Sequence, residues 1–192
     1  GTKLYITKLD AGSVDTLNYD KLWWTTTETS EDGEEIETIT GVENFDEFRY
    51  FTAAKTDSEL FRNNSVLKSI VLPSGWIEIP KFSFSGCTSL EQVLINSGSN
   101  EGIVVGIEAF NKCNKLKEIN FWERIKQIQM NAFYQCYSLE NLTFSNNLTQ
   151  IGHRAFKECE GLLTVELPDS VTYIGEEVFA QCNHLISCKL PN

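Results

Sequence analysis

Residues 151–171 read IGHRAFKECEGLLTVELPDSV, and the same order of residue types occurs six times along the chain. In five copies a cysteine has a phenylalanine three positions before it and a leucine three positions after it. These cysteines, at intervals of 26, 23, 23 and 23 residues, are Cys87, Cys113, Cys136, Cys159 and Cys182. In the remaining copy Asn64 takes the cysteine position, between Phe61 and Leu67. A repeat of this length predicts a solenoid in which each copy forms one coil.

Each coil contains a leucine followed, three and five positions later, by two mostly apolar residues, as Leu162, Val165 and Leu167 show. The alternation of apolar and polar residues at the end of this stretch predicts a short strand with one buried face. Stacked coils bring these strands into a parallel sheet at about 4.8 Å per coil. A second apolar pair follows, such as Leu148 and Ile151, with a turn glycine, Gly152, after it. The stretch up to the cysteine, for example His153–Cys159, predicts one helical or 3₁₀ turn. We therefore expect an α/β repeat solenoid.

Residues 151–171 and their counterparts together resemble BspA-type leucine-rich repeats, and Asn44–Thr52 resembles the cap-like stretch that often precedes such repeats. The resemblance covers residues 41–192. It implies a right-handed superhelix with the parallel sheet on its concave face and short helical or 3₁₀ turns on its convex face. The chain is thus expected to consist of an N-terminal cap and acidic segment, residues 1–40, and an array of about six 23-residue units, residues 41–192.

The first part of the chain is strongly acidic, since residues 1–60 hold 14 Asp and Glu against 5 Lys and Arg. Short strands are predicted at Lys3–Thr7 and Lys21–Thr25, with residues 25–40 as an exposed acidic loop or hairpin tip. Because a solenoid needs a cap, we expect this part to shield the first coil. Trp23 and Trp24 are then better explained as buried cap residues than as a sugar platform.

The cysteines are predicted to form a ladder of thiols in the core. Zinc sites need close pairs such as C-x₂-C, whereas here each cysteine belongs to a separate coil. Free cysteine packs as a small apolar residue. Cys188 stands at a strand position that Val, Ile or Leu fills in the other copies, so it is expected in the core as well. No metal site is predicted.

Catalytic chemistry finds little support in the sequence. The two histidines, His153 and His184, have no evident serine or cysteine partner at a matching place in the repeat. Carboxylate pairs such as Glu176 and Glu177 fall on turns, where a solvated surface is the simpler explanation. No glycine-rich phosphate loop is present. We expect no cofactor and no enzyme, unless residues 1–40 carry a site that the repeats do not reveal.

Charge and hydropathy exclude two kinds of partner. The net charge is −11, which is the opposite of a nucleic-acid-binding surface. No apolar run approaches the roughly 20 residues that a membrane span needs, so no membrane insertion is expected. The chain opens Gly1-Thr2 and has one methionine, Met130, which suggests a trimmed start from which an export signal could have been removed.

The strand positions that face away from the core are the best candidates for a binding surface, because the sheet of a solenoid commonly lines its recognition face. Their side chains are mainly hydroxyls and amides, which suit either a soluble strand or a partner. The candidate residues are Gln92, Leu94, Glu118, Asn120, Trp122, Asn141, Thr143, Thr164 and Glu166.

The resemblance implies an exported bacterial protein, extracellular or at the cell surface, because members of the family are associated with adhesion to host matrix proteins or to other cells. The expected function is non-enzymatic cell-surface adhesion or protein–protein interaction through the concave sheet face. The partner could be a host matrix protein, another cell-surface protein or a glycan. The alternative is a structural or assembly module that self-associates through its open C-terminal coil, residues 185–190.

Overall fold

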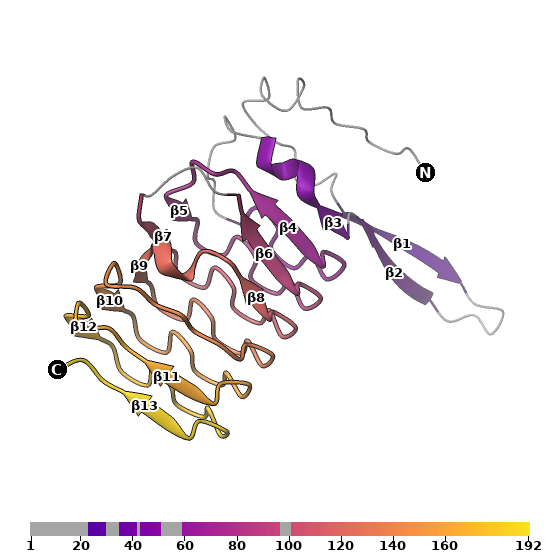
Figure 1. Ribbon diagram of the computed structural model, residues 1–192. Coiled ribbons are helices and arrows are strands. Elements are labelled where there is room, and N and C mark those ends of the chain that lie inside the picture. The colour runs from indigo at the N-terminus through magenta and orange to yellow at the C-terminus, as the bar shows by residue number, and fades with distance from the viewer. Residues whose placement is uncertain (1–22, 30–34, 42, 51–58, 97–100) are drawn as a thin grey trace.

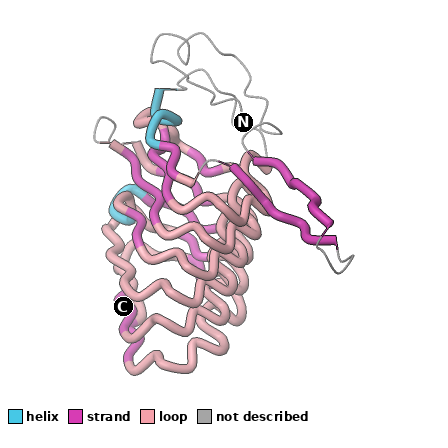
Figure 2. Tube along the Cα trace, turned by 90° about the vertical axis from the view of Figure 1, so that its right-hand side faces the viewer, coloured by secondary structure: helices cyan, strands magenta, loops and turns pink. Residues whose placement is uncertain are grey.

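The repeats form a solenoid of stacked coils, which runs from β3 to β13 (Figure 1). The computed structural model describes residues 23–29, 35–41, 43–50, 59–96 and 101–192. A side view shows the coils stacked one behind another along a single axis (Figure 2). The predicted solenoid of about six turns is confirmed. Its handedness and the assignment of the concave face stay predictions.

The stretches that correspond to residues 162–167 form, together with β3, the first sheet, which we call the front sheet; the stretch at residues 139–144 forms no strand. Its strands are β3 (Asn44–Phe45), β4 (Ser69–Leu72), β6 (Gln92–Ile95), β8 (Glu118–Ile119), β11 (Thr164–Glu166) and β13 (Ser187–Lys189). All pairings are parallel, in the order β3-β4-β6-β8 and, separately, β11-β13. Burial alternates along β6 and β11, with Val93 and Val165 facing the core. The predicted parallel sheet is therefore confirmed.

A second parallel sheet, which the sequence analysis did not predict, forms on another side of each coil. Its strands are β5 (Glu78–Ile79), β7 (Ile103–Val105), β9 (Ile125–Ile128), β10 (Gln150–Ile151) and β12 (Tyr173–Ile174), in the order β12-β10-β9-β7-β5. The signal for it was the second apolar pair of each repeat. In one coil Leu148 and Ile151 of that pair are fully buried, so the pair anchors the strand to the core.

The turn segments, which connect the second sheet to the next front strand, are not helical, so this part of the α/β prediction is wrong. Each contains two residues in the left-handed region, for example Arg154 at φ 56° and Glu158 at φ 61°. A right-handed helix needs negative φ at every residue. Among the described residues, helix is limited to two short 3₁₀ helices, η2 (Asp46–Tyr50) and η3 (Trp122–Arg124).

The left-handed residues direct alternate N–H groups to different partners. The N–H groups of Arg154, Phe156 and Glu158 donate to carbonyls of the next coil over 2.9–3.0 Å. The N–H groups between them, of Ala155 and Lys157, donate back within the same turn over 3.2–3.3 Å. The turn segment thus satisfies its own backbone and bonds to its neighbour at the same time.

The core contains two ladders that run through the coils. Six phenylalanine rings, from Phe61 to Phe179, stack nearly parallel with centroids 5.1–5.6 Å apart. Beside them each cysteine thiol donates to a phenylalanine carbonyl of the preceding coil, as Cys159 Sγ does to Phe133 O over 3.1 Å. The five predicted core cysteines are buried and unbridged, so the expected thiol ladder is confirmed.

Two positions depart from this ladder. Asn64, which replaces a cysteine, is buried, and its Oδ1 accepts the N–H groups of Val66 and Leu67 over 3.1 and 3.0 Å. Cys188 is exposed, so its predicted place in the core is wrong. It lies on β13, which pairs with β11 on one side and has no described strand on the other.

The segment that resembles a cap begins the stack. Phe48 of η2 is fully buried and packs edge-on against Phe61, with centroids 5.4 Å apart, and against Trp76. Further upstream, β1 (Trp23–Thr29) and β2 (Glu35–Gly41) form an antiparallel hairpin that projects from this end of the solenoid (Figure 1). The strand predicted at Lys3–Thr7 lies outside the described residues, and the capping role of residues 1–40 stays a prediction.

The repeated glycines serve close approach between coils, not a left-handed turn. A Cβ on Gly152 would lie 2.6 Å from the backbone nitrogen of Met130 in the preceding coil, and none of this glycine's contacts is a flexible side-chain tip. Gly75, in contrast, has no atom within 4 Å of such a Cβ. A side chain at Gly152 must therefore push two coils apart.

We expect Gly152→Ala to lower the free energy of unfolding by about 1–3 kcal/mol, because overpacking forces the backbone to shift. The matched control Gly75→Ala should leave it unchanged or raise it by up to about 1 kcal/mol, since alanine only restricts the unfolded chain there. Urea denaturation of both variants measures the difference. Equal unfolding free energies would contradict the close packing of these coils.

Candidate functional site

The outward side of the front sheet holds the residues that the sequence predicted as a binding surface. Gln92 and Leu94 lie on β6, Glu118 lies on β8, and Thr164 and Glu166 lie on β11. Leu94 is half-buried and the other four are exposed. We call this surface, together with Asn120, Asn141 and Thr143, the front face.

Trp122 does not belong to the front face, although the sequence analysis included it. Its exposed fraction is 7%, because β8 ends at Ile119 and the chain turns inward as η3. The indole packs against Phe133 with centroids 5.2 Å apart and edge-on against Phe144 at 5.6 Å. This tryptophan therefore fills the core and is not available to a partner.

Asn120 is exposed, but its amide already has partners within the chain. Its Oδ1 accepts the N–H of Ile95 over 2.8 Å, and its Nδ2 donates to the carbonyl of Ile95 over 3.1 Å. The side chain thus completes the hydrogen bonds that a continued β8 would have made with β6. Asn120 supports the front face more than it offers free groups to a ligand.

The centre of the front face has polar groups that are free. Asn141, Thr143 and Thr164 are exposed, and no described residue hydrogen-bonds to their side chains. Residues 141–144 form no strand, so the front sheet is interrupted between β8 and β11. Within the described chain their backbone groups also make no backbone hydrogen bond. This stretch offers both amide and hydroxyl groups to a partner.

The borders of the front face carry acidic residues whose charge is partly balanced. Glu118 accepts a hydrogen bond from Gln92 over 2.7 Å, and Glu166 is ion-paired with Lys189 in the next coil. These contacts connect neighbouring coils across the face. The centre is uncharged and the border residues are held in place.

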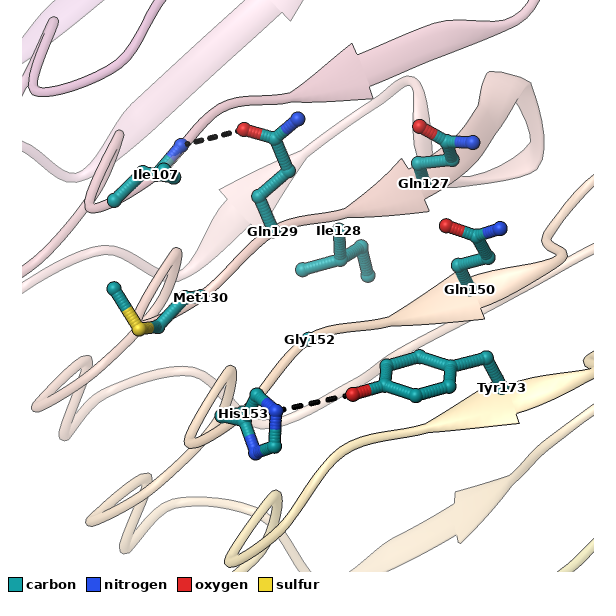
Figure 3. Close-up of a pocket in the computed structure, with 9 residues that line it drawn as sticks. All are labelled: Ile107, Gln127, Ile128, Gln129, Met130, Gln150, Gly152, His153 and Tyr173. Carbon is teal, nitrogen blue, oxygen red and sulfur yellow. Dashed lines mark hydrogen bonds between the residues drawn. The ribbon is translucent and has the colours of Figure 1, made fainter.

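The second sheet carries a shallow groove of about 280 Å³ (Figure 3). It lies over β9, β10 and β12, and its lining includes Gln127, Gln150 and Tyr173 from these three strands. This groove was not predicted from the sequence, because the second sheet was not. Its three strand residues each directly precede an isoleucine of the second apolar pair but are not all of one residue type, so the repeat carried no signal for the groove.

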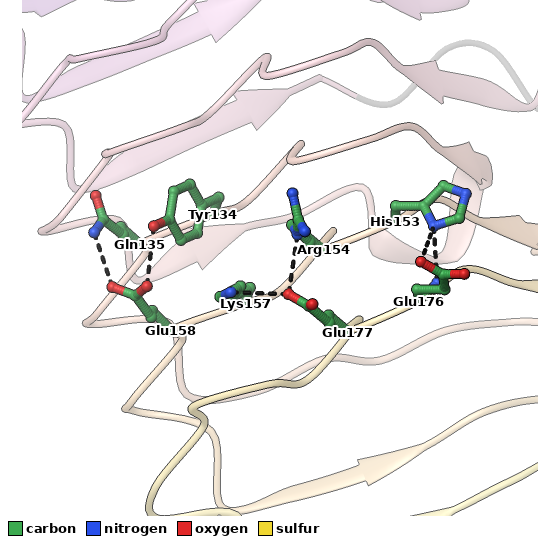
Figure 4. Close-up of polar contacts among 8 residues, drawn as sticks. All are labelled: Tyr134, Gln135, His153, Arg154, Lys157, Glu158, Glu176 and Glu177. Carbon is green, nitrogen blue, oxygen red and sulfur yellow. Dashed lines mark hydrogen bonds and ion pairs between the residues drawn. The ribbon is translucent and has the colours of Figure 1, made fainter.

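The turn segments carry ion pairs and hydrogen bonds between coils (Figure 4). Glu177 contacts Arg154 Nε at 3.0 Å and Lys157 Nζ at 2.9 Å, both in the preceding coil. Hydrogen bonds from these two cations lower the pKa of Glu177 to about 2. One coil earlier, Glu158 accepts hydrogen bonds from Tyr134 and Gln135. This surface therefore uses its charges to hold coils together.

The buried thiols are poor nucleophiles and poor metal ligands. Burial raises the pKa of Cys87, Cys113, Cys136, Cys159 and Cys182, so these thiols keep their protons at neutral pH. Within the described ranges, no three His, Cys, Asp or Glu side chains form a group that could hold a metal ion. In the same ranges no helix is long and apolar enough to cross a membrane.

Comparison with known proteins agrees with this architecture. The family model described as "BspA type Leucine rich repeat region" matches residues 54–186 in six copies. Among solved structures, a leucine-rich repeat protein of T. pallidum is 28% identical with a TM-score of 0.59, and the match covers 87% of this chain and 69% of that one. No curated protein matches the chain.

A second similar structure is a leucine-rich repeat protein of Bacteroides ovatus ATCC 8483, at 25% identity and a TM-score of 0.47. The match covers 86% of this chain and 32% of that one. The chain therefore spans about a third of that protein and somewhat more than two thirds of the T. pallidum protein.

The ion pairs of Glu177 predict a pH dependence. The pKa of Glu177 is lowered in the folded protein, so its contribution to stability is complete above the ordinary glutamate pKa of about 4.3 and is lost as the pH falls toward about 2. In the double variant Arg154→Gln/Lys157→Gln, the titration midpoint of Glu177 should rise toward about 4.3. Carboxyl NMR shifts measured between these pH values check this.

The control for this titration is Lys112→Gln, which removes an exposed cation from a turn segment three coils away from Glu177. It should leave the midpoint of Glu177 where it is. A midpoint near 4.3 in the unsubstituted protein would show that the three side chains do not associate in solution.

Proposed function

Because the chain belongs to the BspA-type leucine-rich repeat family, whose fold generally binds proteins and does not catalyse reactions, we propose that it is a non-enzymatic binding protein whose partner docks on the front face. The partner is a protein outside the cell, either a host matrix protein or another cell-surface protein. The chain would then act at the bacterial surface or in the medium, in adhesion. The family resemblance is what motivates this location.

One observation carries the choice of the front face. Asn141, Thr143 and Thr164 lie side by side in two consecutive coils, exposed and without hydrogen bonds to the described residues. Thr164 is held by β11, and Asn141 and Thr143 flank Leu142, which packs against the core. Polar groups that are already held in place cost little entropy to engage. The interrupted strand at residues 141–144 adds free backbone groups beside them.

The neighbouring surfaces support the same choice. The turn face uses its charged groups in contacts between coils, as Glu177 does with Arg154 and Lys157. On the front face, Glu118 and Glu166 border an uncharged centre. A partner with basic groups at matching positions would gain attraction at the rim and hydrogen bonds at the centre.

The triple variant Asn141→Lys/Thr143→Lys/Thr164→Lys tests the front face. We expect it to lower the affinity for the bound protein by about tenfold or more, because three long cations occupy the centre of the interface. Immobilised extracellular matrix proteins and bacterial surface proteins serve as the panel, and biolayer interferometry measures the affinities.

The control carries the same added charge on the turn side, in Thr88→Lys/Gln181→Lys/Asn183→Lys. It should bind like the unsubstituted protein, and both variants should unfold within about 0.5 kcal/mol of it, as is usual for surface changes. Equal loss in both variants, or no loss in the first, would count against the front face.

A second candidate is assembly through the last coil, which one observation favours. Ile186 and Leu190 are exposed to 83% and 58%, beside the exposed Cys188. Self-association through this surface predicts a molecular mass above 21.8 kDa in light scattering at high protein concentration, and a return to that mass in Ile186→Lys. A mass of one chain at all concentrations would exclude this candidate.

A further inference from the structure

The groove on the second sheet is a separate surface from the front face. We call it the glutamine groove and define it by Gln127, Gln150, Tyr173, His153 and Met130 (Figure 3). Its volume is about 280 Å³, and Ile128, which is 1% exposed, forms part of its floor. The groove is therefore a shallow, partly apolar depression with polar groups along one side.

Three of these side chains stand in register on adjacent strands. Gln150 is the direct neighbour of Gln127 on β9 and of Tyr173 on β12. Adjacent strands lie about 4.8 Å apart, so the row extends over about 10 Å. β10 is paired along both edges, so its backbone is not open to an added strand. A ligand in this groove must be recognised through side chains.

The two glutamines offer unused hydrogen-bonding groups. Neither the amide of Gln127 nor that of Gln150 hydrogen-bonds to a described residue. Each amide combines two N–H donors with one carbonyl acceptor. Gln129, across the groove, differs because its Oε1 accepts the N–H of Ile107 over 3.1 Å. The free amides suit a ligand that is both donor and acceptor at neighbouring positions.

The ring of Tyr173 is held in a fixed orientation. Its hydroxyl lies 3.0 Å from His153 Nε2, while His153 Nδ1 accepts the backbone N–H of Glu176 over 3.0 Å. Because Nδ1 is an acceptor, the proton of the neutral imidazole is on Nε2, and the histidine donates to the tyrosine oxygen. The phenolic hydrogen stays available, and the ring is 46% exposed. Tyr173 thus presents a positioned aromatic surface.

The electrostatics of the groove disfavour charged anionic ligands. With His153 neutral, none of the residues that line it carries a formal charge. The Glu176 carboxylate lies 3.9 Å from His153 Nδ1, and the whole chain has a net charge of −11. An anion would meet repulsion both near the groove and from the protein as a whole.

We propose that the glutamine groove binds a neutral saccharide of about two sugar rings. One ring stacks its C–H face on Tyr173, and the hydroxyls of the next ring donate to and accept from the amides of Gln150 and Gln127. Each sugar hydroxyl can both donate and accept a hydrogen bond, as can each of the two amides. This site is independent of the front face and its partner.

A printed array of neutral oligosaccharides of glucose, galactose, mannose and N-acetylglucosamine, with sialylated and sulfated counterparts, tests the proposal. We expect retention of neutral members and weaker retention of their anionic counterparts. Titration calorimetry with the best-retained oligosaccharide should show a loss of about tenfold or more in Tyr173→Ala, which removes the stacking ring. Gln127→Leu/Gln150→Leu keeps the side-chain size but removes the hydrogen bonds, and should cause a similar loss.

Two controls separate the groove from other surfaces. Ile77→Ala removes a side chain that is 49% exposed just before β5, away from the groove, and should leave saccharide affinity unchanged. The triple lysine variant of the front face should also bind saccharide normally. Retention of anionic members alone, no retention of any neutral member, or unchanged affinity in the glutamine variant would overturn the proposal. The glutamines are solvent-facing, so their replacement tests the site even if Tyr173→Ala unfolds.

Discussion

The architecture depends on the hydrogen bonds that each turn segment makes with the next coil. Two left-handed residues per turn, such as Arg154 and Glu158, direct alternate N–H groups outward along the solenoid axis. This sets the distance between coils, and the phenylalanine rings then stack at 5.1–5.6 Å while each thiol reaches a carbonyl of the coil before it. Neighbouring strands of both sheets are separated by this same distance, because both sheets are built from the same coils.

The positions that packing constrains could be predicted from the sequence. The backbone conformation of the turn segments could not. The front strands and the core positions were predictable, because Phe, Cys and Leu recur wherever a side chain is enclosed on all sides. The turn geometry was not, since Arg154, Glu158 and Lys112 adopt positive φ without any intrinsic preference for it. Only Gly86, Asn63 and Asn131 carried a local signal. The bonds to the next coil offset the strain at the other positions.

The outward placement of residues was predicted correctly on β6, β8 and β11 and was wrong for Trp122, while their role in binding stays a prediction. Alternation identifies outward positions only along an extended chain, so Trp122, beyond the end of β8, was wrongly placed on the surface. Asn120 was correctly predicted to be exposed. Its amide hydrogen-bonds to the backbone of Ile95 because β8 ends at Ile119, and the repeat pattern does not show where this strand ends. The glutamine groove lies on a sheet whose strands show only two constrained positions each. Its outward residues therefore carried no visible pattern.

The thiol ladder has a consequence for the conditions under which the protein can fold. Five of its six cysteines bond to backbone carbonyls as protonated thiols, in separate coils and without a bridge. The folded array therefore needs no disulfide to complete it, in contrast to small extracellular domains that depend on disulfides, and burial shields these five thiols from solvent. The same arrangement leaves Cys188 as the one exposed thiol, so a thiol-specific dye or crosslinker would attach at a single end of the solenoid.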